Sequence, residues 1–321
     1  MTPGGVSGAD LGRRLREGDL SAAPAALNLV ESRTRTDEVH ALLREVSPAA
    51  IGSEPRGHLV GLTGPPGAGK SSLLSALVRA WRADGRTVAV LAVDPSSKRS
   101  GGSLLGDRAR IEFDPSDDGV LIRSTAAGGR LGGLAPATRA AGHALSAAFD
   151  VVVIETVGVG QSETEVAEVA DTVAVVVQPG SGDALQFIKS GIMEVPDVLV
   201  VTKADLGDIA LRARRDLSAS LRSLGEREKR VVAVSSIPPV SGIDDLVAAL
   251  DAHREGLDLP ARRTEARRTS ALADFVVEHG ERGLRALGGR REALRFLAAQ
   301  DAGLDVATLV ERLEERAVAA D

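Results

Sequence analysis

Residues 58–81 read HLVGLTGPPGAGKSSLLSALVRAW. The segment opens with an apolar run that is typical of a strand and continues through Gly64–Ser71, which matches G-x-x-x-x-G-K-[ST]. Leu73, Leu77 and Trp81 then recur at the spacing of a helix. A strand, a glycine-rich turn and a helix in this order form a phosphate cradle, because the N–H groups of the turn and of the helix N-terminus face the anion. We therefore predict that the chain binds a nucleoside triphosphate.

The phosphate loop supplies most of the predicted nucleotide contacts. Lys70 is expected to reach the β- and γ-phosphates, and the Ser71 hydroxyl is expected to ligate Mg²⁺. A turn that ends in Gly-Lys-Ser by chance is the alternative, and the flanking strand and helix disfavour it. The residues expected to contact the phosphates are Gly64, Gly67, Ala68, Gly69, Lys70, Ser71 and Ser72.

Composition restricts the class of protein. The 321 residues are 43% hydrophobic and 26% charged, which is ordinary for a globular chain with one α/β domain and helical additions. No run approaches about 18 apolar residues and no signal-peptide pattern opens the chain, so we expect no membrane association and a cytoplasmic location. The absence of cysteine excludes disulfides, thiolate zinc sites and cysteine nucleophiles.

Charge and aromatic content argue against a nucleic-acid partner. The net charge is −6 and aromatic residues make up 2% of the chain, so a base-stacking surface is not expected. Arginine clusters at 212–215 and 262–268 lie among acidic residues on expected helices, and we interpret them as solvated faces. The five histidines are scattered and are interpreted as isolated surface or helix residues, at positions 40, 58, 143, 253 and 279.

Seven apolar runs have the pattern of a parallel sheet. Most are valine-rich and continuous rather than alternating, which indicates strands buried on both faces by helices. The predicted fold class is therefore α/β: a three-layer (α/β/α) P-loop NTPase fold with a mostly parallel sheet and helical extensions at both termini. The expected strands are 59–63, 87–93, 120–123, 151–155, 173–178, 198–202 and 231–235.

Helical patterns flank the predicted sheet. Apolar residues recur at helical spacing over 10–50, a closing helix is expected at 244–256, and two or three more helices are expected over 261–318. This last region carries no convincing polar constellation, so dimerisation or partner binding is its expected role. The predicted domains are an N-terminal helical extension at 1–56, a nucleotide-binding domain at 57–258 and a C-terminal helical dimerisation arm at 259–321.

Carboxylates end two of the predicted strands. Asp94 follows the second strand, and a glycine- and serine-rich segment at 101–107 after it can change shape with the nucleotide state. Glu155 ends the fourth strand, where an acidic residue opposite Ser71 supports the metal, and Gly158 lets a backbone N–H approach the γ-phosphate. A plain turn at Asp94 and a strand cap at Glu155 are the alternatives. Because parallel strands carry ligands at their carboxyl ends, these positions are expected to meet.

The residues after the sixth strand indicate the base. Thr202-Lys203-Ala204-Asp205 corresponds to the Asn-Lys-x-Asp of P-loop GTPases, in which Asp accepts hydrogen bonds from guanine N1 and N2 and the Lys stem packs on the base. Ser235 and Ser236 fit the loop that offers a backbone N–H to guanine O6. Thr202 lacks the amide with which Asn braces this site. GTP is favoured over ATP, and GTP and GDP are the expected ligands.

Several longer strings resemble the MeaB/ArgK-type P-loop GTPases, the family of methylmalonyl-CoA mutase-associated GTPase chaperones. The most specific string is ETVGVGQSE at 155–163, and the similarity extends over about residues 10–257. The other matching segments are 61–71, 94–97, 101–107, 131–134 and 182–191.

This resemblance implies a GTPase chaperone of an adenosylcobalamin-dependent acyl-CoA mutase, most often methylmalonyl-CoA mutase. Members of the family gate cofactor loading, protect the mutase from inactivation and are typically homodimers, and the mutase stimulates their GTP hydrolysis. The resemblance places the metal-site acids at Asp94, Asp107 and Glu155, and a partner-responsive loop around Gln186 and Lys189. The expected catalytic set is Lys70, Asp94, Glu155, Gln186 and Lys189.

Two other functions remain open at this point. One is a metallochaperone GTPase for nickel or cobalt insertion, which would carry Cys and His ligands near the nucleotide; a chain without cysteine fits that class poorly. The other is an ArgK-type kinase or ATPase that acts on a small molecule or a protein, for which the sequence shows no acceptor-site motif. A nickel titration and the destination of the γ-phosphate distinguish these functions from a GTPase chaperone.

Overall fold

The described part of the chain groups into two compact units. One unit carries the β-sheet and spans His58–Ala135 and Asp150–Leu257, and the other is helical. The helical unit combines Met1–Gly57, Pro136–Phe149 and Asp258–Asp321. The computed structural model describes residues 7–32, 34–94, 111–126, 134–156, 165–180 and 196–320, with the backbone alone at positions 94, 126 and 320.

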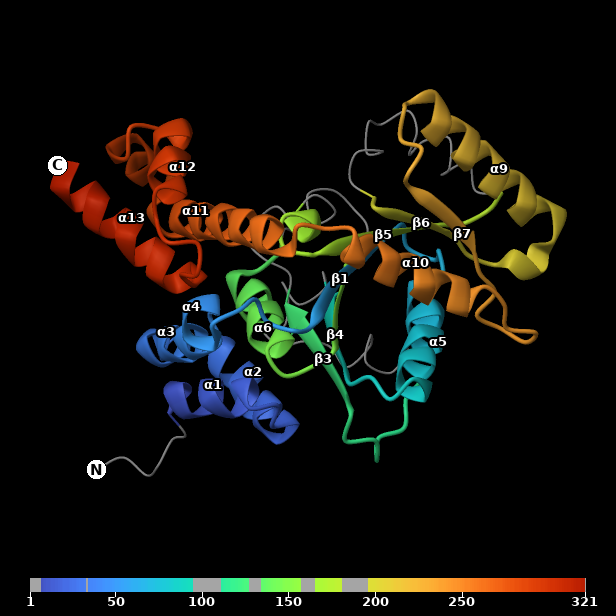
Figure 1. Cartoon of the computed structure of the whole chain (residues 1–321), viewed down its shortest axis with the longest axis horizontal. Helices are drawn as coiled ribbons and strands as arrows, with labels where there is room; N and C mark the ends of the chain where they lie inside the picture. The colour runs from blue at the N-terminus through green and yellow to red at the C-terminus, as the bar shows by residue number, and fades with distance from the viewer. Residues whose placement is uncertain are drawn as a thin grey trace. The chain divides into compact units, whose positions relative to one another are not determined.

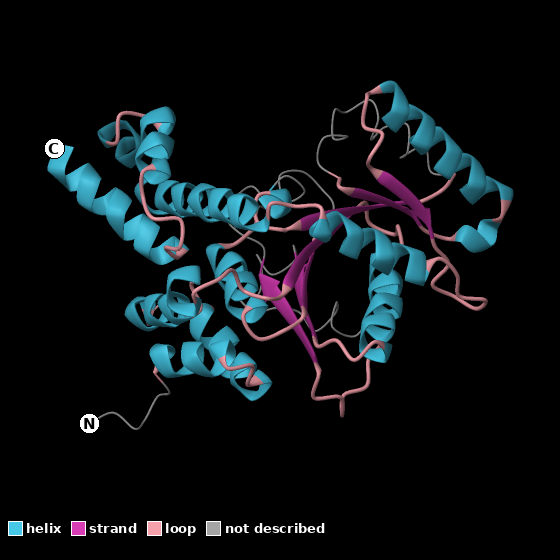
Figure 2. Ribbon diagram, viewed as in Figure 1, coloured by secondary structure: helices cyan, strands magenta, loops and turns pink. Residues whose placement is uncertain are grey.

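Seven strands of the described chain form one sheet in the order β3-β2-β4-β1-β5-β6-β7, and their pairings are parallel (Figures 1 and 2). All seven predicted strands are present with similar bounds, so the α/β prediction is confirmed. The strands are β1 (His58–Thr63), β2 (Val88–Asp94), β3 (Val120–Ala126), β4 (Val151–Glu155), β5 (Thr172–Val177), β6 (Val198–Val201) and β7 (Arg230–Ala233).

Helices cover the sheet within its own unit. The helices α5 (Lys70–Ala83) and α10 (Ile243–Glu255) pack against each other (Figure 1) and share one hydrophobic core with alternate residues of the strands. Trp81 in this core is 1% exposed, and full burial of such a large apolar side chain contributes about 1.5–3 kcal/mol. The short η5 (Ala204–Leu206) leads into α9 (Asp208–Ser223), which packs against β6 and β7.

The helical unit joins segments that are far apart in the sequence. α6 lies between β3 and β4 in the sequence and packs against α2 and α3, while α13 packs against α3 and α11. α11 is kinked at Gly280, whose φ of 62° and ψ of −165° are not helical. The elements are α1 (Gly8–Arg16), η1 (Leu20–Ala22), α2 (Ala23–Val30), α3 (Thr36–Glu45), α4 (Pro48–Ile51), α6 (Pro136–Ser146), α11 (Leu259–Ala286), α12 (Arg290–Ala298) and α13 (Val306–Ala320).

The last three helices form a core of their own. Leu272 and Phe275 of α11, Leu297 of α12 and Leu313 of α13 are buried against one another. The C-terminal helices are thus a packed element. Over the residues that the structure describes, no helix combines the length and the apolar content needed to cross a membrane.

Two arginines of α11 correct the expectation of a solvated basic face at 262–268. Arg263 and Arg267 are 7% and 5% exposed. Arg263 donates to the carbonyl oxygens of Pro55 and Gly57, and Arg267 forms two hydrogen bonds to the carboxylate of Glu54, of 2.8 and 2.9 Å. The expectation failed because the acceptors lie more than 200 positions away in the sequence. The arginines of the 212–215 cluster are exposed, as expected.

Candidate nucleotide-binding site

The parallel sheet places those predicted site residues that the structure describes at the carboxyl ends of its strands or in the loops that follow. Glu155 at the end of β4 lies in register with Leu62 of β1 on one side and Ala92 of β2 on the other. The phosphate loop follows β1, Asp94 ends β2, and Thr202 follows β6. Because all these strands run in the same direction, their carboxyl ends form one continuous rim, which is where parallel sheets bind ligands.

The loop between β1 and α5 has the backbone of an anion cradle. Gly64, Gly67 and Gly69 have φ angles of 144°, 79° and 91°, which residues with a side chain rarely adopt. A Cβ on Gly64 would lie 2.3 Å from the carbonyl oxygen of Val176, whereas one on Gly67 would meet no described atom within 4 Å. The loop is therefore wedged against β5 where it begins and open at Gly67, where a phosphate can approach the backbone.

Lys70, the first residue of α5, curls over this loop. Its Nζ donates to the carbonyl oxygens of Gly64 at 2.6 Å and Pro65 at 3.2 Å, and the residue is 8% exposed. Ser71 is half-buried and Ser72 is exposed in the same first turn. A nearly buried ammonium and a helix N-terminus both favour an anion at this place.

The end of β4 is tied to β1 beside the loop. Glu155 is 9% exposed, and a carboxylate so placed requires hydrogen-bond donors or a cation. The N–H of Thr156 donates to Leu62 O at 2.9 Å, and its Oγ1 donates to Thr63 Oγ1 at 2.8 Å. Four predicted site residues lie outside the described residues: Asp107, Gly158, Gln186 and Lys189.

Thr202 connects the segment after β6, where guanine recognition is expected, to the phosphate loop. Its Oγ1 donates to Ala68 O at 2.6 Å, and the residue is 3% exposed. The following Lys203 has a φ of 55°, which is uncommon for a residue with a side chain, and its Nζ donates to Gly67 O at 3.4 Å. The amide of the usual Asn is absent, but the threonine hydroxyl supplies a direct link to the loop. The sequence suggested that the link made by the asparagine amide is lost; a hydrogen bond from the threonine hydroxyl to the phosphate loop is present in its place.

The loops after β6 and β7 are joined where the guanine base is expected. Ser235 Oγ lies 3.4 Å from Asp205 Oδ1 and 2.9 Å from Ile237 O. The N–H of Ala204 donates to Val234 O at 3.0 Å, and Ser235 exchanges two backbone hydrogen bonds with Ser241, of 2.9 and 3.1 Å. Ser236, beside them, is half-buried. The structure thus places Asp205 and Ser235, two of the residues expected to contact guanine, next to each other.

Ser75 supports the candidate site from behind the first turn of α5, and the sequence analysis did not single it out. Its Oγ donates to Ser71 O at 3.0 Å and accepts from the N–H of Glu112 at 2.8 Å, and the residue is 3% exposed. It holds the chain after position 110 against the first turn of α5. The available signal in the sequence was that Ser75 lies one turn after Ser71, on the apolar face of the helix.

Two histidines that were expected to be isolated are joined at the opposite edge of the sheet. His58 Nε2 lies 2.8 Å from Thr172 Oγ1, which lies 2.9 Å from His253 Nδ1. His253 Nε2 lies 3.3 Å from Asp197 Oδ1. Because a hydroxyl has one hydrogen, it donates to at most one imidazole, so the two tautomers are coupled. This network connects the starts of β1 and β5 to the end of α10.

Comparisons with known proteins agree with this geometry. The family model described as methylmalonyl Co-A mutase-associated GTPase MeaB matches residues 23–283. The chain is 38% identical over 270 residues to GTPase ArgK of Escherichia coli, covering 81% of this chain and 80% of that protein. It is 42% identical over 214 residues to the mitochondrial methylmalonic aciduria type A homolog of Mus musculus, covering 63% of this chain and 50% of that protein.

One solved structure is similar to this chain over nearly its whole length. The crystal structure of LAO/AO transport system kinase covers 96% of this chain and 96% of its own, with 30% sequence identity and a TM-score of 0.64. Together with the phosphate loop, these similarities show that the chain is a P-loop GTPase, which belongs to the MeaB family of methylmalonyl Co-A mutase-associated GTPases.

Proposed function

We propose that this GTPase is a chaperone that gates the loading of adenosylcobalamin into a B12-dependent acyl-CoA mutase of the methylmalonyl-CoA mutase type, and that it protects that mutase. The family match carries this proposal, because it spans residues 23–283 and the family is described by its association with methylmalonyl-CoA mutase. The name of the mouse relative, which refers to methylmalonic aciduria, supports the same metabolic context.

The described residues fit a magnesium nucleotide. The open backbone at Gly67 and the nearly buried ammonium of Lys70 suit the phosphates, and the phosphate-contacting set is Gly64, Gly67, Ala68, Gly69, Lys70, Ser71 and Ser72. Magnesium, when bound, neutralises charge on the phosphate oxygens. We assign its ligands, direct or through water, to Ser71, Asp94, Asp107 and Glu155, and guanine recognition to Thr202, Lys203, Asp205, Ser235 and Ser236.

Phosphoryl transfer to water needs positioning and charge neutralisation more than covalent chemistry. Lys70 supplies a fixed positive charge where the phosphates would bind, and we assign to Gly158 the backbone N–H that would approach the γ-phosphate. We assign to Gln186 and Lys189 the role of reaching the nucleotide when the mutase docks. Intrinsic turnover is therefore slow, and the partner raises it by completing the set of charged groups around the phosphates.

The remaining parts of the chain serve assembly. The extension at 1–56 and the arm at 259–321 flank the nucleotide-binding domain at 57–258, and the arm joins two copies into a homodimer. The packed core of α11, α12 and α13 supports this role, since a dimerisation arm must keep its own shape. We place the complex in the cytoplasm, with no nucleic-acid or membrane partner.

A binding experiment with a methylmalonyl-CoA mutase tests the proposal. The full chain is immobilised and offered the mutase with GDP, with a non-hydrolysable GTP analogue and without nucleotide. The mutase is expected to be retained, and the amount of adenosylcobalamin delivered to it, read from its absorption spectrum, is expected to depend on the nucleotide. Lys70→Ala is the control that should remove the nucleotide dependence. Absence of retention in all three conditions would contradict the proposal.

The kinase named in the structural comparison motivates a second candidate, phosphoryl transfer to an acceptor other than water. GTP labelled in its γ-phosphate distinguishes the two functions when it is incubated with the chain and a cell extract. Release of the label as inorganic phosphate alone is expected. Label in a protein or a small molecule, lost in Lys70→Ala, would favour the kinase.

A further inference from the structure

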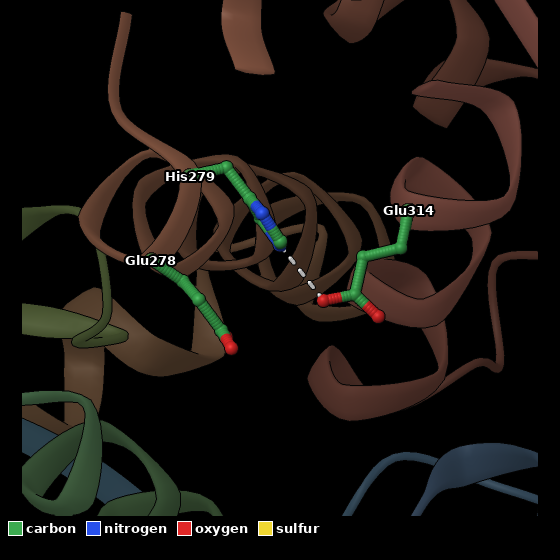
Figure 3. A group of neighbouring side chains, drawn as sticks. All are labelled: Glu278, His279 and Glu314. Carbon is green, nitrogen blue, oxygen red and sulfur yellow. Dashed lines mark hydrogen bonds and ion pairs between the residues drawn. The ribbon is translucent and has the colours of Figure 1, made fainter. Parts of the chain in front are cut away.

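Three metal-ligating side chains meet outside the nucleotide site. Glu278 and His279 of α11 and Glu314 of α13 each offer one ligand atom, and these atoms lie within 4.8 Å of one another (Figure 3). His279 Nε2 lies 2.9 Å from Glu314 Oε1. This cluster corrects two expectations: His279 is not isolated, and the C-terminal helices do carry a polar constellation.

The spacing of these atoms is close to that of a metal site. Ligands to zinc lie about 2.0–2.2 Å from the ion, so two ligands of one ion are about 3–4 Å apart. The His279–Glu314 pair, now hydrogen-bonded at 2.9 Å, would need to open only slightly to admit an ion. Glu278 is exposed, so its side chain has room for a change of rotamer that brings its carboxylate closer to the other two ligand atoms.

The imidazole is held in place by its neighbours. The ring of Phe275, one helical turn earlier and 1% exposed, lies 4.5 Å from the ring of His279 between centroids. Figure 3 shows His279 directed from α11 toward Glu314 on α13. A ligand whose ring is oriented before the ion arrives loses less conformational entropy on binding.

The charge around the cluster also favours a cation. Two carboxylates face one imidazole, so the cluster is negative when the imidazole is neutral or protonated. The negative charge of Glu278 also acts on Asp274, which lies one turn earlier in α11. Burial is the main cause that raises the pKa of the Asp274 carboxyl; Arg139 lowers this pKa, and the Glu278 carboxylate raises it. A cation bound at Glu278 would relieve this repulsion.

We propose that Glu278, His279 and Glu314 bind a divalent transition cation of the Zn²⁺, Co²⁺ and Ni²⁺ class, which bridges α11 and α13. Imidazole is a preferred ligand of these ions, whereas Mg²⁺ and Ca²⁺ prefer all-oxygen sites. Water completes the coordination, since the side chains are partly exposed. The site lies in the C-terminal helices and does not depend on the proposed chaperone function.

Titration of the full chain with Co²⁺ tests this site through the visible absorption of the protein-bound ion. Excess Mg²⁺ and GDP keep the nucleotide site occupied, and competition by Zn²⁺ measures its affinity. The wild-type chain is expected to bind cobalt saturably at one site. His279→Ala and Glu314→Gln are each expected to weaken binding about tenfold or more, since even residues behind the direct ligands contribute at least that much.

Glu281→Gln is the matched control, because it removes the same charge from an exposed position of the same helix. It should bind cobalt as the wild-type chain does. Zn²⁺ should also raise the Tm of the wild-type chain and of Glu281→Gln, and leave that of His279→Ala and Glu314→Gln unchanged. No saturable cobalt spectrum in the wild-type chain, or equal affinity in His279→Ala, would overturn the proposal.

Discussion

At the scale of single residues, Thr202 shows how a departure from a family motif can preserve a connection. Its hydroxyl donates to Ala68 O, a carbonyl of the phosphate loop, and the residue is nearly buried. A threonine side chain is shorter than an asparagine side chain. Its hydroxyl nevertheless reaches the Ala68 carbonyl, because the two residues are adjacent in the fold. The phosphate loop is therefore hydrogen-bonded to a residue of the motif that we assign to base recognition.

Replacing Thr202 with valine keeps the shape of the side chain and removes the donor. The Ala68 carbonyl then loses a partner in a buried place, which costs about 1–3 kcal/mol. We expect Thr202→Val to weaken GDP binding about fivefold or more, as measured by titration with a fluorescent GDP analogue. Thr202→Ser retains the hydroxyl and should bind nearly as the wild-type chain does. Equal affinity of the valine variant and the wild-type chain would show that the brace has no role in binding.

At the scale of elements, two ion pairs join helices to segments that precede strands. Arg267 of α11 binds Glu54 in the segment that precedes β1. Arg82 at the end of α5 binds Asp117 in the segment that precedes β3 through two hydrogen bonds of 2.7 and 2.8 Å. Each ion pair joins a helix to the segment that precedes a strand. The two pairs differ in burial, so they should contribute differently to the free energy of unfolding.

The Arg267–Glu54 pair has side chains that are 6% and 11% exposed. Breaking a buried pair by removing one partner leaves a charge without compensation, which costs about 3–5 kcal/mol. We expect Arg267→Met to lower the free energy of unfolding by about that amount in urea denaturation. The double variant Arg267→Met, Glu54→Gln should recover part of the loss, because neither charge then remains. A double variant less stable than Arg267→Met would contradict this explanation.

The Arg82–Asp117 pair predicts a pH dependence. The hydrogen bonds from Arg82 chiefly hold the pKa of Asp117 below its ordinary value of 3.8. A lowered folded-state pKa contributes stability above the unfolded-state pKa, and this contribution is lost as the pH falls through the folded-state pKa. Asp117→Asn should therefore be less stable than the wild-type chain at neutral pH, by at most about 1 kcal/mol. The difference, followed by thermal unfolding, should begin to shrink below pH 3.8 and vanish only below the lowered folded-state pKa of Asp117; a difference that persists in still stronger acid would exclude the ion pair as its cause.

At the scale of the whole molecule, the sequence predicts what depends on local pattern. A parallel strand that is covered on both faces must be apolar throughout, so the valine-rich runs located all seven strands of the described sheet. The phosphate loop could also be predicted from the sequence, because its closely spaced glycines adopt the positive φ angles that the loop requires. The contacts of Thr202, Ser75 and the two buried arginines of α11 could not be predicted from the sequence. Each depends on a hydrogen-bond partner in a segment that lies farther along the chain.

We propose that a mutase partner controls nucleotide hydrolysis by this chain. The rate of GTP hydrolysis by the purified full chain, measured with and without a methylmalonyl-CoA mutase at saturating GTP and Mg²⁺, tests this control. We expect slow GTP turnover by the chain alone and a clear increase with the mutase, and we expect Lys70→Ala to abolish both. Turnover of tens per second without a partner, or a rate that the mutase leaves unchanged, would contradict it.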